Sequence, residues 1–181
     1  MVQAVIRRKA PAIFVNHGAG PLPLLKPVTD PDHGPTRAFL EQVAPQWLGL
    51  KDLATKPAAI VVVTAHWETI PEVTISSGES HDLLYDYYGF PSDAYSISYK
   101  AKGSPAVAQK IHDLLSQASI PSKLDATRGW DHGTFVPMKL INPEEDIPVV
   151  QMSVVGSWDP AHHLRIGQVL AALRDENIAI L

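Results

Sequence analysis

The chain has 181 residues, of which 45% are hydrophobic, which is enough for one domain with a substantial core and too few to predict two. Its formal net charge is −4 and its basic residues are scattered, so neither nucleic acid nor an anionic membrane is an expected partner. The absence of cysteine excludes disulfides, cysteine-bound zinc, iron–sulfur clusters and thiol catalysis, whereas eight histidines leave imidazole chemistry open. Residues 1–9 include three basic side chains with no apolar stretch behind them, which predicts a cytoplasmic protein without a signal peptide.

Two apolar segments in the first third of the chain are typical of strands in a buried parallel sheet. Residues 58–63 are rich in β-branched side chains and lack polar alternation, which predicts a central strand covered on both faces. Residues 12–15 predict a shorter strand. His17 and His66 follow these two strands, and ligands of open α/β sheets bind at the carboxyl edge. Both imidazoles are therefore expected at a ligand-binding edge.

The segments that follow predict a loop, helices and further strands. Five prolines between residues 21 and 35 predict a long irregular loop, and residues 36–48 have a helical period that Pro45 is expected to end or kink. Residues 72–76 and 94–99 alternate as half-buried strands do, on either side of a polar and aromatic loop at 77–91. Ser104 and Pro105 predict the N-cap and first turn of a helix that runs to about Gln117.

The C-terminal third predicts two strands, at 122–125 and 148–154, and a short helix at 135–141. Residues 160–176 predict an amphipathic helix with Leu164, Val169, Leu170 and Leu173 turned inward. Residues 178–181 begin a last strand that would return to the sheet by a right-handed crossover and leave an open edge. Together the elements predict a single-domain α/β fold of three layers, a mostly parallel central sheet with helices on both faces.

Three histidines lie where this sheet edge would gather them: His17, His66 and His132, the last in an Asp-His-Gly turn. Imidazole is a common ligand of zinc and non-haem iron, and a metal needs ligands from separate rigid elements, which favours His17 and His66 as metal ligands. His132 lies in a tight turn before a helix and suits acid/base catalysis near neutral pH. Each could instead be a hydrogen-bonded structural histidine, and the turn at His132 could be a simple helix N-cap.

Other patterns near these histidines give less specific signals. Glu68 shares the strand face of His66, either as a site residue or as a solvated carboxylate. The glycines at 18 and 20 lack the third glycine of a dinucleotide fingerprint. A zinc deaminase would need a cysteine pair, and a serine hydrolase a Gly-x-Ser-x-Gly elbow, and the chain has neither. Tyr87, Tyr88 and Phe90 could wall an aromatic substrate pocket or pack over the sheet.

Six segments, in order along the chain, resemble the class III extradiol ring-cleavage dioxygenases, and most closely the branch similar to 4,5-DOPA extradiol dioxygenase. They are residues 17–23 (HGAGPLP), 61–67 (VVVTAHW), 87–91 (YYGFP), 129–138 (GWDHGTFVPM), 148–153 (PVVQMS) and 173–176 (LRDE). Because the matches occur in the family's order from near residue 11 to the end, the resemblance covers nearly the whole chain.

The resemblance implies a metal-dependent enzyme that inserts O₂ into a catechol-type, DOPA-like substrate, so the expected partners are this small molecule and O₂. It implies one Fe(II) or Zn(II) per chain, with His17 and His66 as ligands and His132 as the acid/base that takes a catechol proton. Substrate contact is implied for four residues of the matching segments, namely Tyr88, Phe90, Trp130 and Asp131.

The resemblance also implies a departure from the family at the C-terminus. Relatives of this branch continue into a segment that supplies their third protein ligand, so residues 1–181 are expected to be the N-terminal portion of the family's catalytic domain. Glu68, Asp131 or a neighbouring chain would have to replace that ligand, and the open strand at 178–181 offers a surface for oligomerisation. Two alternatives follow: a non-enzymatic, inactive homologue that acts as a binding module, or a zinc hydrolase in which His132 shuttles protons.

Overall fold

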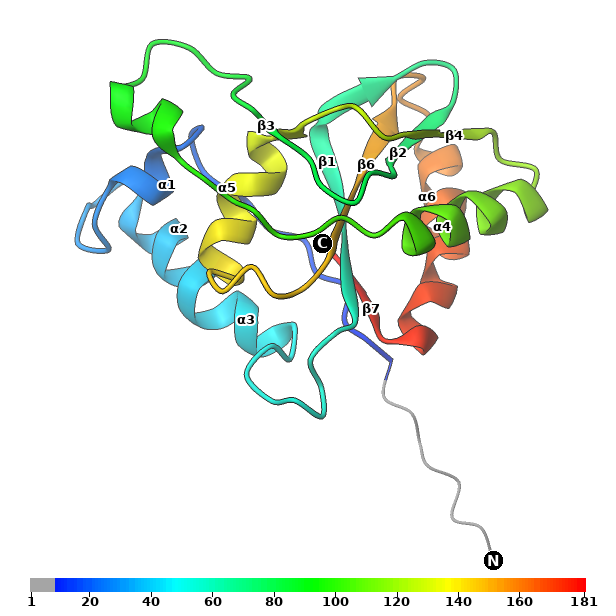
Figure 1. Cartoon of the computed structure of the whole chain (residues 1–181), viewed down its shortest axis with the longest axis horizontal. Helices are drawn as coiled ribbons and strands as arrows, with labels where there is room; N and C mark the ends of the chain where they lie inside the picture. Colours follow the sequence, from blue (N-terminus) through cyan, green and yellow to red (C-terminus); the bar gives the residue numbers. More distant parts are fainter. Residues whose placement is uncertain (1–8) are drawn as a thin grey trace, which may run out of the picture.

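A five-stranded sheet forms the centre of the fold over residues 9–181, the part of the chain that the computed structural model describes (Figure 1). From edge to edge its strands are β4 (Ser122–Asp125), β2 (Val73–Ser76), β6 (Val149–Val155), β1 (Ala59–Thr69) and β7 (Ile178–Ile180). β1 is parallel to β6 and β7, and β2 is parallel to β4, whereas β2 and β6 are antiparallel. The prediction of a mostly parallel sheet is confirmed. A separate short ladder pairs β3 (Leu83–Leu84) with β5 (Trp130–Asp131).

Helices cover both faces of the sheet, which confirms the three-layer α/β fold (Figure 1). On one side α5 (His132–Ile141) packs with a helical segment formed by α2 (Gly34–Ala38), η1 (Phe39–Val43) and α3 (Ala44–Trp47). On the other side lie α4 (Pro105–Gln117) and α6 (Pro160–Leu170), which continues into the 3-10 helix η3 (Ala171–Glu176). Alternate residues of β1 serve the two layers: Ile60 and Val62 pack in one core, and Ala59 and Val61 in the other. This strand lacks polar alternation because both of its faces are buried.

The segment at 36–48 is helical as predicted, but Pro45 does not end it. A π-helical turn, η1, precedes this proline, and the N–H of Ala44 donates to the carbonyl of Phe39, five residues earlier. Proline has no N–H to donate and crowds the carbonyl four residues before it in a regular helix, so the wider turn lets the helical path continue. In the proline-rich loop before it, α1 (Leu22–Leu25) forms a single helical turn, so that loop is less irregular than expected.

Other elements match the predictions closely or depart from them for identifiable reasons. The bounds of α4 and β4 are those predicted. β2 is buried along its length instead of half-buried, because it lies inside the sheet between β6 and β4. Residues 94–99 do not form a strand and contribute instead to the 3-10 helix η2 (Ser92–Ser96). α6 turns Ile166 and Leu170 inward, whereas Leu164 is 65% exposed, so its predicted inward position is wrong. No helix within residues 9–181 has the length and apolar character needed to cross a membrane.

The last strand, β7, is the edge strand of the sheet, but a bridge covers its outer edge at Ile180, so the edge predicted at 178–181 is not fully open. One edge pairs with β1, through Ala59 to Val61. Along the other edge, the N–H of Ile180 donates to Pro11 O, and the N–H of Ile13 donates to Ile180 O, at 3.0 Å each. The segment predicted as a strand at 12–15 forms only this isolated bridge, centred on Ala12. These two bonds satisfy the outward-facing N–H and carbonyl of Ile180, which an edge strand would otherwise expose.

Candidate metal centre

Three imidazoles meet above the carboxyl end of β1. His17 follows the extended segment at 10–15, His66 lies near the end of β1, and His132 is the first residue of α5. Each offers a ring nitrogen within 4.8 Å of those of the other two, and Nε2 of His17 lies 3.0 Å from Nε2 of His66. The ring centroids of His66 and His132 are 4.0 Å apart. The structure therefore brings together the three histidines that the sequence singled out.

An irregularity in β1 turns His66 toward this cluster. Thr64 pairs with Ser153 of β6, but the next paired residue is Glu68, opposite Val154, so residues 65–67 bulge out of the ladder. The N–H of His66 donates to Oγ1 of Thr64 at 3.1 Å, which fixes the backbone of the bulge. The strand was expected to end before Thr64, but it runs on to Thr69 with this bulge inside it. Glu68 lies beyond the bulge, is exposed and is not part of the histidine cluster.

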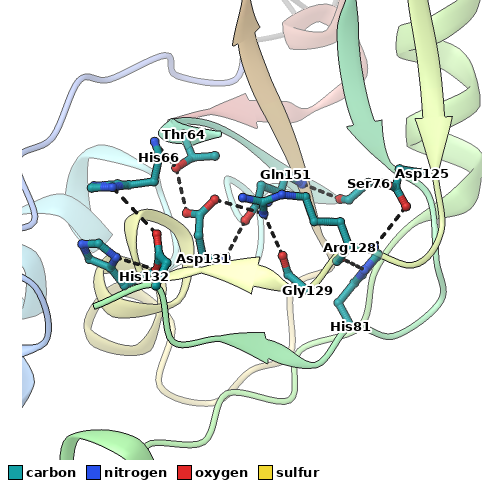
Figure 2. Close-up of polar contacts among 11 residues, drawn as sticks. Thr64, His66, Ser76, His81, Asp125, Arg128, Gly129, Asp131, His132 and Gln151 are labelled. Carbon is teal, nitrogen blue, oxygen red and sulfur yellow. Dashed lines mark hydrogen bonds and ion pairs between the residues drawn. The ribbon is translucent and has the colours of Figure 1, made fainter. Parts of the chain in front are cut away.

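A buried polar network supports the bulge from below (Figure 2). Thr64 Oγ1 donates to Oδ1 of Asp131 at 2.8 Å, and Arg128 forms an ion pair with the other oxygen of Asp131 at 3.3 Å. Arg128 also lies over the ring of Trp67, 4.4 Å from its centroid. Burial raises the pKa of the Asp131 carboxyl, which is 0% exposed, although Thr64 and Arg128 counteract this effect. Asp131 therefore supports the strand that carries His66.

Gly133 permits the close packing of α5 against the bulge. A Cβ at this position would lie 2.5 Å from Cδ2 of His66 and 2.6 Å from Oγ1 of Thr64. Carbon atoms in contact are normally separated by about 3.5–4.0 Å. The glycine after His132 is therefore needed so that the first turn of α5 can approach His66.

Asp86 is a site residue that sequence reasoning missed. Its Oδ1 accepts hydrogen bonds from Nδ1 of His132 at 2.7 Å and from the backbone N–H of the same residue at 3.0 Å. Its Oδ2 lies 3.9 Å from Nδ1 of His66. Burial alone would raise the pKa of Asp86, but the bonds from His132 outweigh it and hold this pKa below its usual value. The pair is separated by 46 residues in the chain, so no spacing pattern could have linked them.

The electrostatics of the cluster keep two of its histidines neutral. Burial, followed by the charges of His132 and His66, lowers the pKa of His17 to about 4. Burial and the charge of His132 also lower the pKa of His66. Both imidazoles are therefore unprotonated near neutral pH, which is the form that binds a metal. Nδ1 of His17 is buried and has no hydrogen-bond partner within residues 9–181, so no second residue fixes its tautomer.

A pocket of about 250 Å³ opens beside His17 and His66. Its wall is mainly apolar and includes Phe14, Val62 and Leu181, with Gly133 at the side of α5. A pocket of this size and character suits a small, largely apolar molecule.

The four residues implied as substrate contacts lie outside the lining of this pocket. Trp130 is 0% exposed and stacks on His81, and Asp131 belongs to the buried network, so neither offers surface to a ligand. Tyr88 is 89% exposed, and the partly buried Phe90 packs against Tyr87. The structure thus gathers the predicted ligands and acid/base but does not bring these four side chains to them.

A cluster of imidazoles at the carboxyl edge of an α/β sheet defines a candidate metal protein with histidine ligands. The family model described as the catalytic LigB subunit of aromatic ring-opening dioxygenase matches residues 11–181. The chain belongs to this family, so the resemblance to extradiol dioxygenases is confirmed.

Several curated relatives are similar over nearly the whole chain. Dioxygenase tasH from Hapsidospora irregularis is 48% identical over 95% of this chain and 52% of its own length. The 4,5-DOPA dioxygenase extradiol of Beta vulgaris is 40% identical over 93% of this chain and 59% of its own length. The protein of the same name from Escherichia coli (strain K12) is 38% identical over 96% of this chain and 58% of its own length. The chain thus spans between half and three-fifths of the length of these relatives.

A solved structure has the same fold. The uncharacterized protein JW3007 from Escherichia coli K12 is 36% identical in sequence and superposes with a TM-score of 0.61. The alignment covers 80% of this chain and 50% of the E. coli chain. The mostly parallel sheet and its two helical layers are therefore features that this chain shares with a longer protein.

Proposed function

We propose that this chain is the histidine-bearing portion of an extradiol dioxygenase that inserts O₂ into a catechol-type, DOPA-like substrate. Two observations support the proposal: the match to a ring-opening dioxygenase family, and the cluster of His17, His66 and His132, of which the first two line a pocket. Relatives named 4,5-DOPA dioxygenase extradiol suggest the substrate class. Residues 1–181 would then be the N-terminal portion of the family's catalytic domain, and we propose that the enzyme acts in the cytoplasm.

His17 and His66 are the residues that we expect to hold a mononuclear metal, one Fe(II) or Zn(II) per chain. Two metal–nitrogen bonds of about 2.1 Å at right angles would place their nitrogens about 3.0 Å apart. The Nε2 atoms of His17 and His66 are separated by 3.0 Å, and both rings are neutral near pH 7, so the pair fits a metal ion. When bound, Fe(II) would supply redox chemistry and open coordination positions for two small ligands.

His132 is the residue that we expect to move protons. Its Nδ1 is held by Asp86, so Nε2 is the ring nitrogen left to take a proton from a catechol hydroxyl and later return it. The ring is buried between His66 and Tyr87, which limits competing proton exchange with water. Tyr88 and Phe90 remain candidate substrate contacts because both retain exposed surface. Trp130 and Asp131 are better placed to support the site than to contact a substrate.

The metal assignment can be tested by titrating Fe(II), without oxygen, or Zn(II) into the purified chain. Loss of a residue that only hydrogen-bonds a metal ligand weakens metal binding by roughly 10–100-fold. His66→Ala removes a ligand itself, so it should weaken metal binding by more than this. His162→Ala is the matched control, since this histidine lies on α6 on the other side of the sheet. Equal metal affinity of the two variants would refute the ligand assignment.

Catalysis can be tested separately by O₂ uptake with catechol or DOPA and by the yellow semialdehyde product. His132→Gln should bind metal as the parent does but lose turnover, because it removes only the proton carrier. Metal binding without product at any metal loading would support the binding-module alternative. Equal turnover of parent and His132→Gln would refute the acid/base role.

A zinc hydrolase is a second candidate because all three histidines lie close enough to bind one ion. Three histidines that leave one position free for water form a common catalytic zinc site. In this case His132→Gln would weaken Zn(II) binding as His66→Ala does, and activity would depend neither on O₂ nor on a reductant. Association through the edge of β7 is not part of either proposal, because residues 11–13 occupy that edge.

A further inference from the structure

The carboxylate of Asp86 faces two of the three clustered imidazoles and accepts two hydrogen bonds from His132, one from its ring and one from its backbone. Oδ1 accepts from both Nδ1 and the backbone N–H of His132, at 2.7 and 3.0 Å. An acceptor at Nδ1 requires the proton to be on that nitrogen, which leaves Nε2 with its lone pair. We propose that Asp86 is a positioning residue that holds His132 in the Nδ1-protonated tautomer and fixes its ring relative to the backbone.

The small ladder formed by β3 and β5 places the two residues opposite each other. Leu84 pairs with Asp131, so Asp86 follows two residues beyond one strand and His132 directly follows the other. The N–H of Asp86 donates to the carbonyl of Leu84 at 2.9 Å, which tightens the turn after β3. The pairing therefore sets the distance between the carboxylate and the imidazole through backbone bonds.

The tyrosines on both sides of Asp86 restrict its movement. The hydroxyl of Tyr85 donates to Ile97 O at 2.7 Å, and that of Tyr87 donates to Ala94 O at 2.6 Å. The ring of Tyr85 also packs edge-on against Phe135, the fourth residue of α5. Because its neighbours are tied both to η2 and to α5, Asp86 is held where His132 needs an acceptor. A hydrogen-bond partner that is itself held rigidly keeps a catalytic or metal-binding imidazole in one orientation.

The tautomer can be measured on the metal-free chain by the ¹⁵N chemical shifts of the His132 ring at neutral pH, assigned by their loss in His132→Gln. The parent should show a protonated Nδ1 and an unprotonated Nε2. The opposite pattern in the parent would overturn the proposal without any variant. Asp86→Ala should shift the ring toward the Nε2-protonated form, which a free neutral imidazole favours.

Two further variants separate positioning from a general structural effect. Asp86→Asn keeps an oxygen that can accept from Nδ1 and should keep the parent tautomer, which gives a rescue and a folded protein if Asp86→Ala does not fold. Asp82→Ala is the matched control, because that side chain is exposed in the same segment and makes no hydrogen bond within the described residues. If His132 had the same ring shifts in Asp86→Ala as in Asp82→Ala, the proposal would be wrong.

The catalytic consequence, unlike the tautomer, rests on the proposed function. If the parent turns over catechol, Asp86→Ala should lower kcat by about 10–100-fold with little change in KM, since the pocket wall is unchanged. Asp82→Ala should keep the parent kcat. An unchanged kcat in Asp86→Ala would overturn the positioning role. Absence of turnover in the parent would count against the proposed function alone, because the ring shifts would still report the tautomer.

Discussion

Replacing Gly133 by alanine should disturb the metal site through a single methyl group. The new Cβ would lie 2.5 Å from Cδ2 of His66, and since such contacts are normally about 3.5–4.0 Å, the ring would have to retreat by about 1 Å. The second close neighbour, Thr64 Oγ1 at 2.6 Å, cannot move away freely because it bonds Asp131. Overpacking of this kind costs about 1–3 kcal/mol, and a displacement of about 1 Å in a site can cost up to about 100-fold in its function.

Two measurements test this expectation. The melting temperature of the metal-free protein should fall by roughly 2–12 °C, taking about 2–4 °C per kcal/mol for a chain of this size. Metal affinity, measured by titration of Zn(II), should fall by about 10–100-fold because the His66 ring leaves its position beside His17.

Gly167→Ala provides the matched control. Gly167 lies exposed in α6, and a Cβ there would meet nothing within 4 Å, so the same substitution should stabilise the helix by about 0.5–1 kcal/mol. Metal affinity should stay at the parent value. If Gly133→Ala had the same melting temperature and metal affinity as Gly167→Ala, the close packing of α5 against the bulge would not constrain the position of His66.

Three further expectations concern stability. The metal-free chain should become less stable as the pH falls from about 6.5 to about 4. In this range His17 is protonated in the unfolded chain but stays neutral in the folded chain, where its pKa is lowered to about 4. Denaturant titrations at several pH values should show this loss, and His17→Asn should reduce it; a steeper loss in the variant would contradict the cause. Thr64→Val should lower the free energy of unfolding by about 1–3 kcal/mol, since it removes a hydrogen bond to the buried Asp131, and an unchanged urea midpoint would argue against this network. Leu48→Ala should cost about 2–5 kcal/mol because Leu48 is 0% exposed, whereas Leu53→Ala, at a residue 90% exposed, should stay within about 0.5 kcal/mol; similar values for both would show that the helix after Pro45 does not pack as described.

Much of the fold could be predicted because buried segments have a recognisable amino-acid composition. The first half of β1 is covered on both faces and is an unbroken apolar run, β6 is apolar except for Gln151 and Ser153, and α4 begins with the predicted Ser104 cap. The gathering of His17, His66 and His132 also followed from local signals, since each lies near the end of a strand or at the start of a helix. Such features depend on residues that are close together in the sequence, so they can be predicted from one sequence.

The remaining features depend on pairings between distant segments. The bulge at residues 65–67 arises from a shift in the register between β1 and β6. The apolar residues before it give no indication of this shift. Asp86 reaches His132 through the β3 and β5 ladder, whose strands are two residues long and carry no periodic signal. The bridge that covers the outer edge of β7 at Ile180 was missed for the same reason, because its partner is at the opposite end of the chain.

The pairing of the two ends of the chain determines when the metal site can form during synthesis. Ala12 bridges Ile180, a separation of 168 residues, so the segment that leads to His17 has no backbone partner in the sheet until β7 has left the ribosome. Contacts between residues so far apart in the sequence form late in folding, because the entropy cost of closing the long loop between them comes before the contacts stabilise the chain. His66 and His132 can be placed by β1 and α5 before that moment. The complete imidazole cluster should therefore be among the last features of the described chain to appear, and a nascent chain that stops short of β7 should leave His17 unanchored.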